Sequence, residues 1–400
     1  MSLENLNPQQ LQAVQHCEGP LIVVAGAGSG KTRVITCRIA HLIKEKGLPP
    51  ESILAITFTN KAANEMKSRL IKITGLDSRQ FRWVRTYHSA CLMILKQHCE
   101  KMGYQTPLQV LSLYQQEKLA EEICINNNIE KKYTKLVLST LSGAKNSGKP
   151  EKYLSRKKSF LPVRWTDLLD KYEERLMEMN GVDFDNILLK TRELLKTHED
   201  VRDFYRNYFS YILVDEYQDT NNLQEDLTEF LLGPHRNLFC VGDDWQAVYG
   251  VRGSNLNHFL RFAEKYKDAK IFRLEENYRS ADEIVQAAND LIDYNPDKMD
   301  KKCFSRKKGG LIEIYDFFSD TQEAEWVAKR IKSLNQNGSG ISYDRIAVMY
   351  RTRFCSLPFE KIFRIYRIPY TLKGAQGFFE RMEILDINSY LNAALFPNDN

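Results

Sequence analysis

The sequence has no long hydrophobic run, no paired cysteines and little excess charge of either sign. No stretch approaches the about 18 consecutive apolar residues of a membrane-spanning helix, and the N-terminus lacks the basic and apolar segments of a signal peptide. The eight cysteines are scattered, without a C-x-x-C pair or a histidine at zinc-ligand spacing, so we expect reduced thiols. From these absences we expect a cytoplasmic protein with no membrane partner.

Proline, glycine and net charge are also modest. The 400 residues include 12 prolines and 20 glycines, with 43% hydrophobic and 27% charged residues, which excludes a disordered or fibrous chain. Such a length predicts two or three folding units. A net charge of +5 is compatible with a polyanionic partner but does not by itself indicate one.

Short apolar runs alternate with segments of helical period, a pattern typical of a parallel sheet flanked by helices. The candidate strands are residues 21–25, 53–57, 84–86, 211–215, 238–242 and 271–275. The stretch from 108 to 193 breaks this rhythm, because it is helical in pattern and has no clear buried strand. It predicts an inserted helical subdomain.

A second α/β pattern begins near residue 311, after a basic segment (300–310) that predicts a linker. Its expected strands are 311–317 and 346–350, and its expected helices are 321–334 and 357–366. Two strands are few for a complete parallel sheet.

A glycine-rich loop lies between the first candidate strand and a helical segment, the context that a phosphate-binding P-loop requires. Its residues are Ala25, which replaces the consensus glycine, and Gly26, Ala27, Gly28, Ser29, Gly30, Lys31 and Thr32. The glycines allow backbone N–H groups and the helix N-terminus to face a phosphate. We expect Lys31 at the β- and γ-phosphates and the Thr32 hydroxyl at Mg²⁺. The alternative is a tight turn without a ligand.

Two carboxylates follow the apolar run 211–214. A nucleotide hydrolase needs one carboxylate at a strand end to orient Mg²⁺ and a second group to polarise the attacking water. Asp215 fits the first role and Glu216 the second. An Asp-Glu pair in a solvated turn is the alternative, which the preceding strand and the P-loop disfavour.

Further motifs occur in a fixed order along nearly the whole chain. They are LNPQQLQAV (6–14), GAGSGKTR (26–33), LAITFTNKAANEM (54–66), RTYHS (85–89), VDFDNIL (182–188), VDEYQDTN (214–221), VGDDWQAVYGVRGS (241–254), LEENYRS (274–280), AVMYRTR (347–353) and GFFERMEILDINSYL (377–391). This series resembles superfamily 1 DNA helicases of the UvrD/Rep/PcrA type. The resemblance implies an ATP-dependent helicase or translocase that uses ATP and Mg²⁺. It also implies single-stranded DNA and duplex junctions as partners, 3′-to-5′ movement, and a role in DNA repair or replication.

The resemblance implies a RecA-like P-loop NTPase domain with a helical insertion, followed by an incomplete second RecA-like domain. The expected bounds are 1–107 with 194–281 for the first domain, 108–193 for the insertion, 282–386 for the second domain and 387–400 for the start of a second insertion. The chain ends without the family's last two core motifs, so we expect it to be the N-terminal part of a longer protein.

The resemblance also assigns residues to the nucleotide. Gln10 is implied at the adenine edge and Arg33 near the base. Tyr278 is suited to stack on adenine, and Arg279 is suited to the γ-phosphate. Gln246, which follows the strand 238–242, is expected to sense the γ-phosphate and signal to the DNA contacts.

A second set of residues is expected to bind DNA. It combines flat rings for base stacking with phosphate donors, and its members are Phe58, Thr59, Asn60, Lys61, Thr86, Tyr87, His88, Tyr249 and Arg252. Packing in the core is the alternative for each aromatic residue. Val251, Trp245 and Glu276 depart from residues common in the family, and Val251 cannot stack on a base.

Two other functions remain open at this stage. The chain is compatible with the motor portion of a helicase-nuclease, which would need a further nuclease domain. It is also compatible with a DNA-binding module whose ATPase is vestigial, although Lys31, Thr32, Asp215 and Glu216 argue against that.

Overall fold

The computed structural model describes residues 6–248, 250, 253–336, 340–373, 386–387 and 390. The chain divides into two compact units, residues 1–311 and residues 312–400. The first unit carries the P-loop and the Asp215–Glu216 pair.

The first unit is built on a six-stranded sheet in which every pair of neighbours is parallel. The strand order is β3-β2-β6-β7-β1-β8. The strands are β1 (Leu21–Ala25), β2 (Ile53–Thr57), β3 (Val84–Thr86), β6 (Tyr211–Val214), β7 (Leu238–Gly242) and β8 (Lys270–Leu274). Each lies within one residue of its expected bounds, which confirms the predicted α/β fold.

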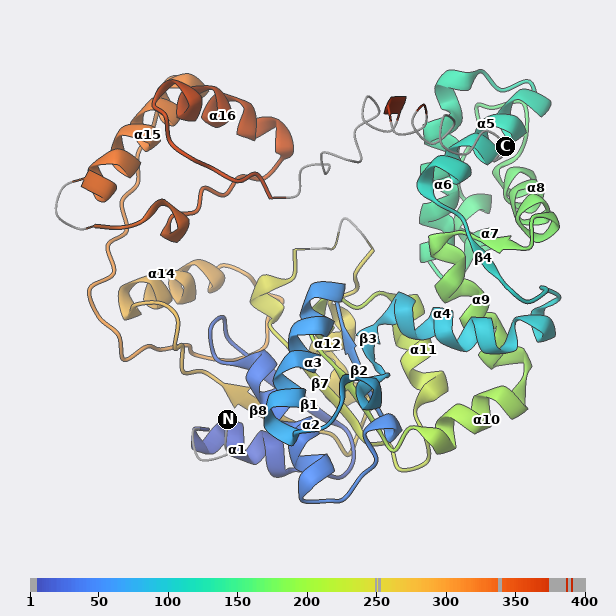
Figure 1. Cartoon of the computed structure of the whole chain (residues 1–400), viewed down its shortest axis with the longest axis horizontal. Helices are drawn as coiled ribbons and strands as arrows, with labels where there is room; N and C mark the ends of the chain where they lie inside the picture. Colours follow the sequence, from blue (N-terminus) through green and yellow to red (C-terminus); the bar gives the residue numbers. More distant parts are fainter. Residues whose placement is uncertain are drawn as a thin grey trace. The chain divides into compact units, whose positions relative to one another are not determined.

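Helices cover both faces of this sheet (Figure 1). Alternate residues of β1 belong to different cores: Leu21 and Val23 pack with α1 (Pro8–Gln15), α2 (Lys31–Lys44) and α3 (Asn60–Thr74). Ile22 and Val24 face the opposite side. The helices there are α4 (Tyr87–His98), α9 (Phe184–Thr197), α10 (Glu199–Tyr208), α11 (Asn222–Leu231), α12 (Asn257–Leu260) and α13 (Phe262–Lys265). Burial on both faces explains why these strands are continuous apolar runs.

The expected helical insertion forms a cluster of helices with a core of its own (Figure 1). Its helices are α5 (Leu113–Asn126), α6 (Thr134–Asn146), α7 (Pro150–Ser155) and α8 (Trp165–Glu178). Two short strands, β4 (Gln109–Val110) before these helices and β5 (Gly181–Val182) after them, pair in parallel. The buried ammonium of Lys145 binds Glu173 at 2.7 Å and Asp183 at 2.6 Å, which ties α6 and α8 to the start of α9.

The second unit contains α15 (Asp320–Gln336) and α16 (Ser356–Ile365), which match the two expected helices and pack on each other. The expected strands at 311–317 and 346–350 were wrong, because neither segment forms a strand in the described residues. A strand requires a hydrogen-bonded neighbour. Leu311, Ile314 and Met349 are instead largely exposed.

The remaining helix of the first unit is α14 (Asp282–Ile292).

None of the helices in the described parts of the chain has the length and apolar character needed to cross a membrane. All eight cysteines are free thiols. Apart from 386–387 and 390, the motif 377–391 lies outside the described residues.

Candidate nucleotide-binding site and DNA face

The glycine-rich loop leads from β1 directly into α2. Gly28 and Gly30 have φ angles of 66° and 89°, and Gly30 is the N-cap of α2. These left-handed conformations favour glycine. A Cβ at Gly28 would also lie 2.7 Å from Arg279 Cβ and 2.8 Å from Asn277 Oδ1. Glycine at this position therefore allows the loop that carries Arg279 to approach the P-loop.

The second loop, residues 275–280, binds backbone carbonyl groups of the P-loop. Asn277 donates from Nδ2 to the Ala27 carbonyl at 2.7 Å, and the Tyr278 N–H donates to the Gly28 carbonyl at 3.0 Å. Asn277 Oδ1 also accepts from the backbone N–H of Arg279 at 2.8 Å. Tyr278 is 43% exposed beside the loop, and its expected stacking on a base stays a prediction.

Gln10 connects the start of the chain to the same region. It is 2% exposed, and its Nε2 donates to the Ser29 carbonyl at 2.8 Å. Asn7 caps α1 and donates from Nδ2 to the Tyr278 hydroxyl at 2.8 Å. The residues expected around the adenine therefore lie together, with the Gln10 amide bound to the P-loop backbone.

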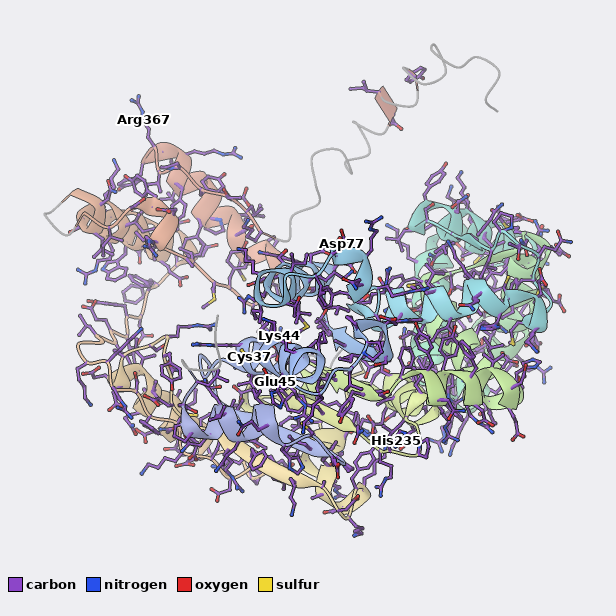
Figure 2. All side chains as sticks on the ribbon, turned by 60° about the horizontal axis from the view of Figure 1, so that its bottom comes forward. Cys37, Lys44, Glu45, Asp77, His235 and Arg367 are labelled. Carbon is purple, nitrogen blue, oxygen red and sulfur yellow. The ribbon has the colours of Figure 1, made fainter. Side chains whose placement is uncertain are left out.

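Arg33 lies in the first turn of α2, and its guanidinium lies beside the thiol of Cys37 on the same helix. Figure 2 labels Cys37 and, at the end of the helix, Lys44. Burial raises the pKa of the Cys37 thiol. This thiol is therefore protonated at neutral pH and inert.

Asp215 and Glu216 follow β6, two strands away from β1 in the sheet. Asp215 is 7% exposed, and one of its carboxylate oxygens accepts from the Glu216 N–H at 3.1 Å. Burial, with the nearby Glu216 carboxylate, raises the pKa of Asp215 to about 7. Glu216 has a φ of 51° and a ψ of 45°, a left-handed backbone conformation that side chains rarely adopt.

The donor set fits magnesium. Asp215 makes no ion pair within the described residues, and the nearby charge of Lys31 only partly offsets the burial that raises its pKa. No cluster of three or more His, Cys, Asp or Glu side chains in the described part of the chain suits a metal ion. Magnesium does not require one, since it commonly uses one or two carboxylates together with substrate phosphates.

The end of β7 adds a second acidic segment beside the P-loop. Asp243 lies 3.6 Å from Lys31 Nζ and accepts from Gln246 Nε2. Lys301, from the segment that precedes the second unit, is fully buried and binds both Asp243 and Asp244. This arrangement brings Lys31 and Gln246 to one carboxylate, and the role of Gln246 as a γ-phosphate sensor stays a prediction.

The expected DNA-binding residues begin at the carboxyl ends of β2 and β3, which are neighbours with Thr57 opposite Thr86. Phe58 is 43% exposed, and Thr59, Asn60 and Lys61 are exposed at the start of α3. Thr59 and Thr86 are the N-caps of α3 and α4 and accept from the Ala62 and Ser89 N–H groups. Tyr249 and Arg252 lie outside the described residues.

The two rings that begin α4 differ in their surroundings. Tyr87 packs against the core, and its hydroxyl lies 2.9 Å from Thr228 Oγ1, which favours packing over base stacking. His88 stacks on Phe184, with ring centroids 3.8 Å apart and planes 16° apart. Burial lowers the pKa of His88 to about 4, so the ring is neutral at pH 7 and cannot bind phosphate as a cation.

Sequence reasoning missed three residues that the structure brings to these sites. They are Asn277, Lys301 and Phe184, which is 52% exposed and extends the aromatic face of His88. Phe184 lies inside the quoted motif 182–188, so a base-stacking role could have been considered from its position. Asn277 lies inside the quoted motif 274–280, but the motif does not indicate its contact with Ala27. Lys301 lies outside the quoted motifs and acts through Asp243 and Asp244.

The parallel sheet, the glycine loop after β1 and the buried Asp215 after β6 define a P-loop, RecA-like nucleotide-binding domain. Comparison with known proteins narrows this class. Residues 6–267 match the family model described as UvrD/REP helicase N-terminal domain, and residues 272–400 match the UvrD-like helicase C-terminal domain. The chain belongs to the UvrD/REP helicase family.

Individual relatives agree with this assignment. An ATP-dependent DNA helicase PcrA of Staphylococcus epidermidis is 38% identical over 99% of this chain and 55% of its own length. A protein of the same name from Staphylococcus aureus is 36% identical over 99% of this chain and 54% of its own length. The chain spans about half the length of the curated relatives it matches.

Proposed function

We propose that the protein is an ATP-dependent DNA helicase or translocase that moves along single-stranded DNA. The observation that carries this proposal is the distribution of residues along one edge of the parallel sheet. The P-loop, Asp215 and Asp243 follow β1, β6 and β7, whereas the aromatic and polar residues follow β2 and β3. Because all these strands are parallel, their carboxyl ends share one edge.

In this proposal the nucleotide site hydrolyses ATP with residues of this chain. Lys31 binds the β- and γ-phosphates, and Asp215 and Thr32 hold Mg²⁺, which would neutralise phosphate charge. Glu216 orients the attacking water and Arg279 stabilises the γ-phosphoryl group. The base lies against Tyr278, near Gln10 and Arg33.

DNA would bind along the ends of β2 and β3. Phe58 and the His88–Phe184 pair offer faces for bases, while Thr59, Asn60, Lys61 and Thr86 offer donors to phosphates. Gln246 connects the two sites, because it binds Asp243 beside Lys31 and precedes the motif residues Tyr249 and Arg252. A nucleotide-dependent change at Asp243 would thereby reach the DNA contacts.

We further propose 3′-to-5′ movement, action at duplex junctions and a cytoplasmic role in DNA repair or replication. These features rest on the family resemblance, while the names of the relatives support only ATP-dependent DNA helicase activity. The vestigial-ATPase alternative is disfavoured, because the P-loop and the Asp215–Glu216 pair that hydrolysis needs are both present.

DNA-stimulated ATP hydrolysis tests the proposal. The full-length protein that contains this chain is expected to hydrolyse ATP with Mg²⁺ and to do so faster when single-stranded DNA is added. Lys31→Met should abolish both rates while leaving the fold intact by circular dichroism. An ATPase rate that DNA does not change would contradict a motor and favour a nucleotide switch.

A further inference from the structure

Gln218 is a buried amide between the two acidic segments of the nucleotide site. It lies in the short 3-10 helix Tyr217–Asp219 that follows Glu216, and it is 1% exposed. Neither the P-loop nor the Walker-type carboxylates require a glutamine here, and the roles proposed above do not use it. A buried polar side chain of this size needs hydrogen bonds to offset its desolvation.

Both ends of this amide are engaged. Gln218 Nε2 donates to Glu216 Oε2 at 2.9 Å, and its Oε1 accepts from the backbone N–H of Asp243 at 3.0 Å. The amide therefore joins the carboxylate that follows β6 to the backbone that follows β7. The orientation of the amide is determined by these partners. If its oxygen and nitrogen were exchanged, the amide NH2 would face the Asp243 N–H, and the amide oxygen would face the Glu216 carboxylate.

The surrounding structure holds the amide in place. Tyr217 is fully buried and its hydroxyl donates to the buried Glu225 at 2.7 Å, which anchors the 3-10 helix. A Cβ at Gly242 would lie 2.3 Å from Gln218 Oε1, so the last residue of β7 must be glycine for the amide to fit. The site is thus shaped around this side chain.

Glu216 needs such a partner more than an ordinary carboxylate does. Its backbone is left-handed, and its side chain is only half-buried, so local structure leaves its rotamer weakly determined. A general base or water-orienting group loses much of its effect when it is misplaced by about 1 Å. Gln218 Nε2 binds Glu216 Oε2 at 2.9 Å and lies 3.5 Å from Asp219 Oδ2, so the shorter hydrogen bond favours one position of the Glu216 carboxylate.

We propose that Gln218 is a positioning residue that orients Glu216 for water activation and links that orientation to the Asp243 segment. This inference rests on the ATPase proposed above. Asp243 also contacts Lys31 and accepts from Gln246, so movement of its backbone would be transmitted through one amide to Glu216. Hydrolysis would then depend on the state of the segment that leads to the DNA contacts.

The test compares kcat, nucleotide affinity and stability in variants of the protein. Gln218→Met keeps the length but removes both hydrogen bonds, and Gln218→Glu keeps the acceptor for Asp243 N–H but removes the donor to Glu216. Each should lower kcat about 10- to 100-fold, which corresponds to loss of one hydrogen bond to a charged group. The Kd for Mg–ADP should stay within about twofold, because the phosphate and metal contacts remain.

A double variant separates positioning from general damage. If Gln218 acts through Glu216, Glu216→Gln combined with Gln218→Met should be no slower than Glu216→Gln alone. Gln224→Met is the matched control, because Gln224 only completes the capping box at the start of α11. It should lower the thermal midpoint slightly and leave kcat unchanged.

Two results would overturn this inference while leaving the ATPase proposal in place. One is a wild-type kcat in Gln218→Glu or Gln218→Met, and the other is full additivity in the double variant. A wild-type protein that does not hydrolyse ATP would overturn the ATPase proposal and this inference together.

Discussion

The ammonium of Lys301 lies 2.7 Å from Asp243 Oδ1, and both side chains are buried, 0% and 1% exposed. Asp243 is the carboxylate that also faces the P-loop lysine, at 3.6 Å. Lys301 binds Asp244 as well and lies 4.5 Å from the centre of the Trp245 ring. A lysine 58 residues away in sequence thus supplies one buried positive charge to the two carboxylates that follow β7.

Removal of this lysine should destabilise the protein. Lys301→Met would leave the buried Asp244 without its cation and would leave Asp243 with Lys31, at 3.6 Å, as its remaining one. Removal of one partner from a buried ion pair costs about 3–5 kcal/mol. The free energy of unfolding, measured with urea, should fall by that amount. Lys302→Met is the control, because that side chain is exposed, and its effect should stay within about 0.5 kcal/mol.

Magnesium-dependent nucleotide binding should depend on pH through Asp215. The pKa of Asp215 is raised from 3.8 to about 7, so without metal this carboxyl is largely protonated at pH 6 and ionised at pH 8. Magnesium binds the ionised form. The Kd for Mg–ADP should therefore be up to about tenfold weaker at pH 6 than at pH 8. Titration calorimetry at both pH values measures this difference, and Asp215→Asn should remove it.

The raised pKa of Asp215 also determines how the stability of the metal-free protein changes with pH. Between about pH 4 and about pH 7 the folded state keeps a proton that the unfolded chain has lost. Stability from this group therefore falls as the pH rises through that window and levels off above it. Added Mg²⁺ should reduce this loss, because it stabilises the ionised carboxyl.

The aromatic face beside β3 should contribute to DNA affinity. Phe184→Ala removes the ring that stacks on His88, and loss of one base-stacking surface costs about 1–3 kcal/mol of binding free energy. Fluorescence anisotropy with a labelled oligothymidine measures the change. Phe204→Ala is the control, since Phe204 is 49% exposed on α10 but lies on another element of the fold. Equal losses in the two variants would remove Phe184 from the DNA face.

The sheet, the P-loop and the Asp215–Glu216 pair could be predicted from the sequence, because each depends on local pattern. Strands buried on both faces are continuous apolar runs, and the glycine loop between β1 and α2 is a contiguous motif. The prediction of strands at 311–317 and 346–350 was wrong. An apolar run does not by itself supply the neighbouring strand with which it would pair.

Residues that act across the fold were harder to predict. Gln218, Asn277 and Lys301 each bind a residue distant in sequence, and the sequence around them does not indicate that partner. For Gln218 this partner is the Asp243 N–H, whereas Glu216 is a neighbour in the same motif. Tyr87 is a motif residue that was expected to bind DNA. In the structure its ring packs against the core, and its hydroxyl hydrogen-bonds Thr228. Its place on the DNA face stays a prediction.

Strand separation tests the proposed motor most directly. The full-length protein that contains this chain would be mixed with ATP, Mg²⁺ and a fluorescent duplex that carries a single-stranded tail at either the 3′ or the 5′ end. We predict ATP-dependent unwinding of the 3′-tailed duplex, little unwinding of the 5′-tailed duplex, and none by Glu216→Gln, which should still bind ATP. Unwinding that continues without ATP hydrolysis, or that proceeds equally in Glu216→Gln, would contradict the proposed ATP-driven motor.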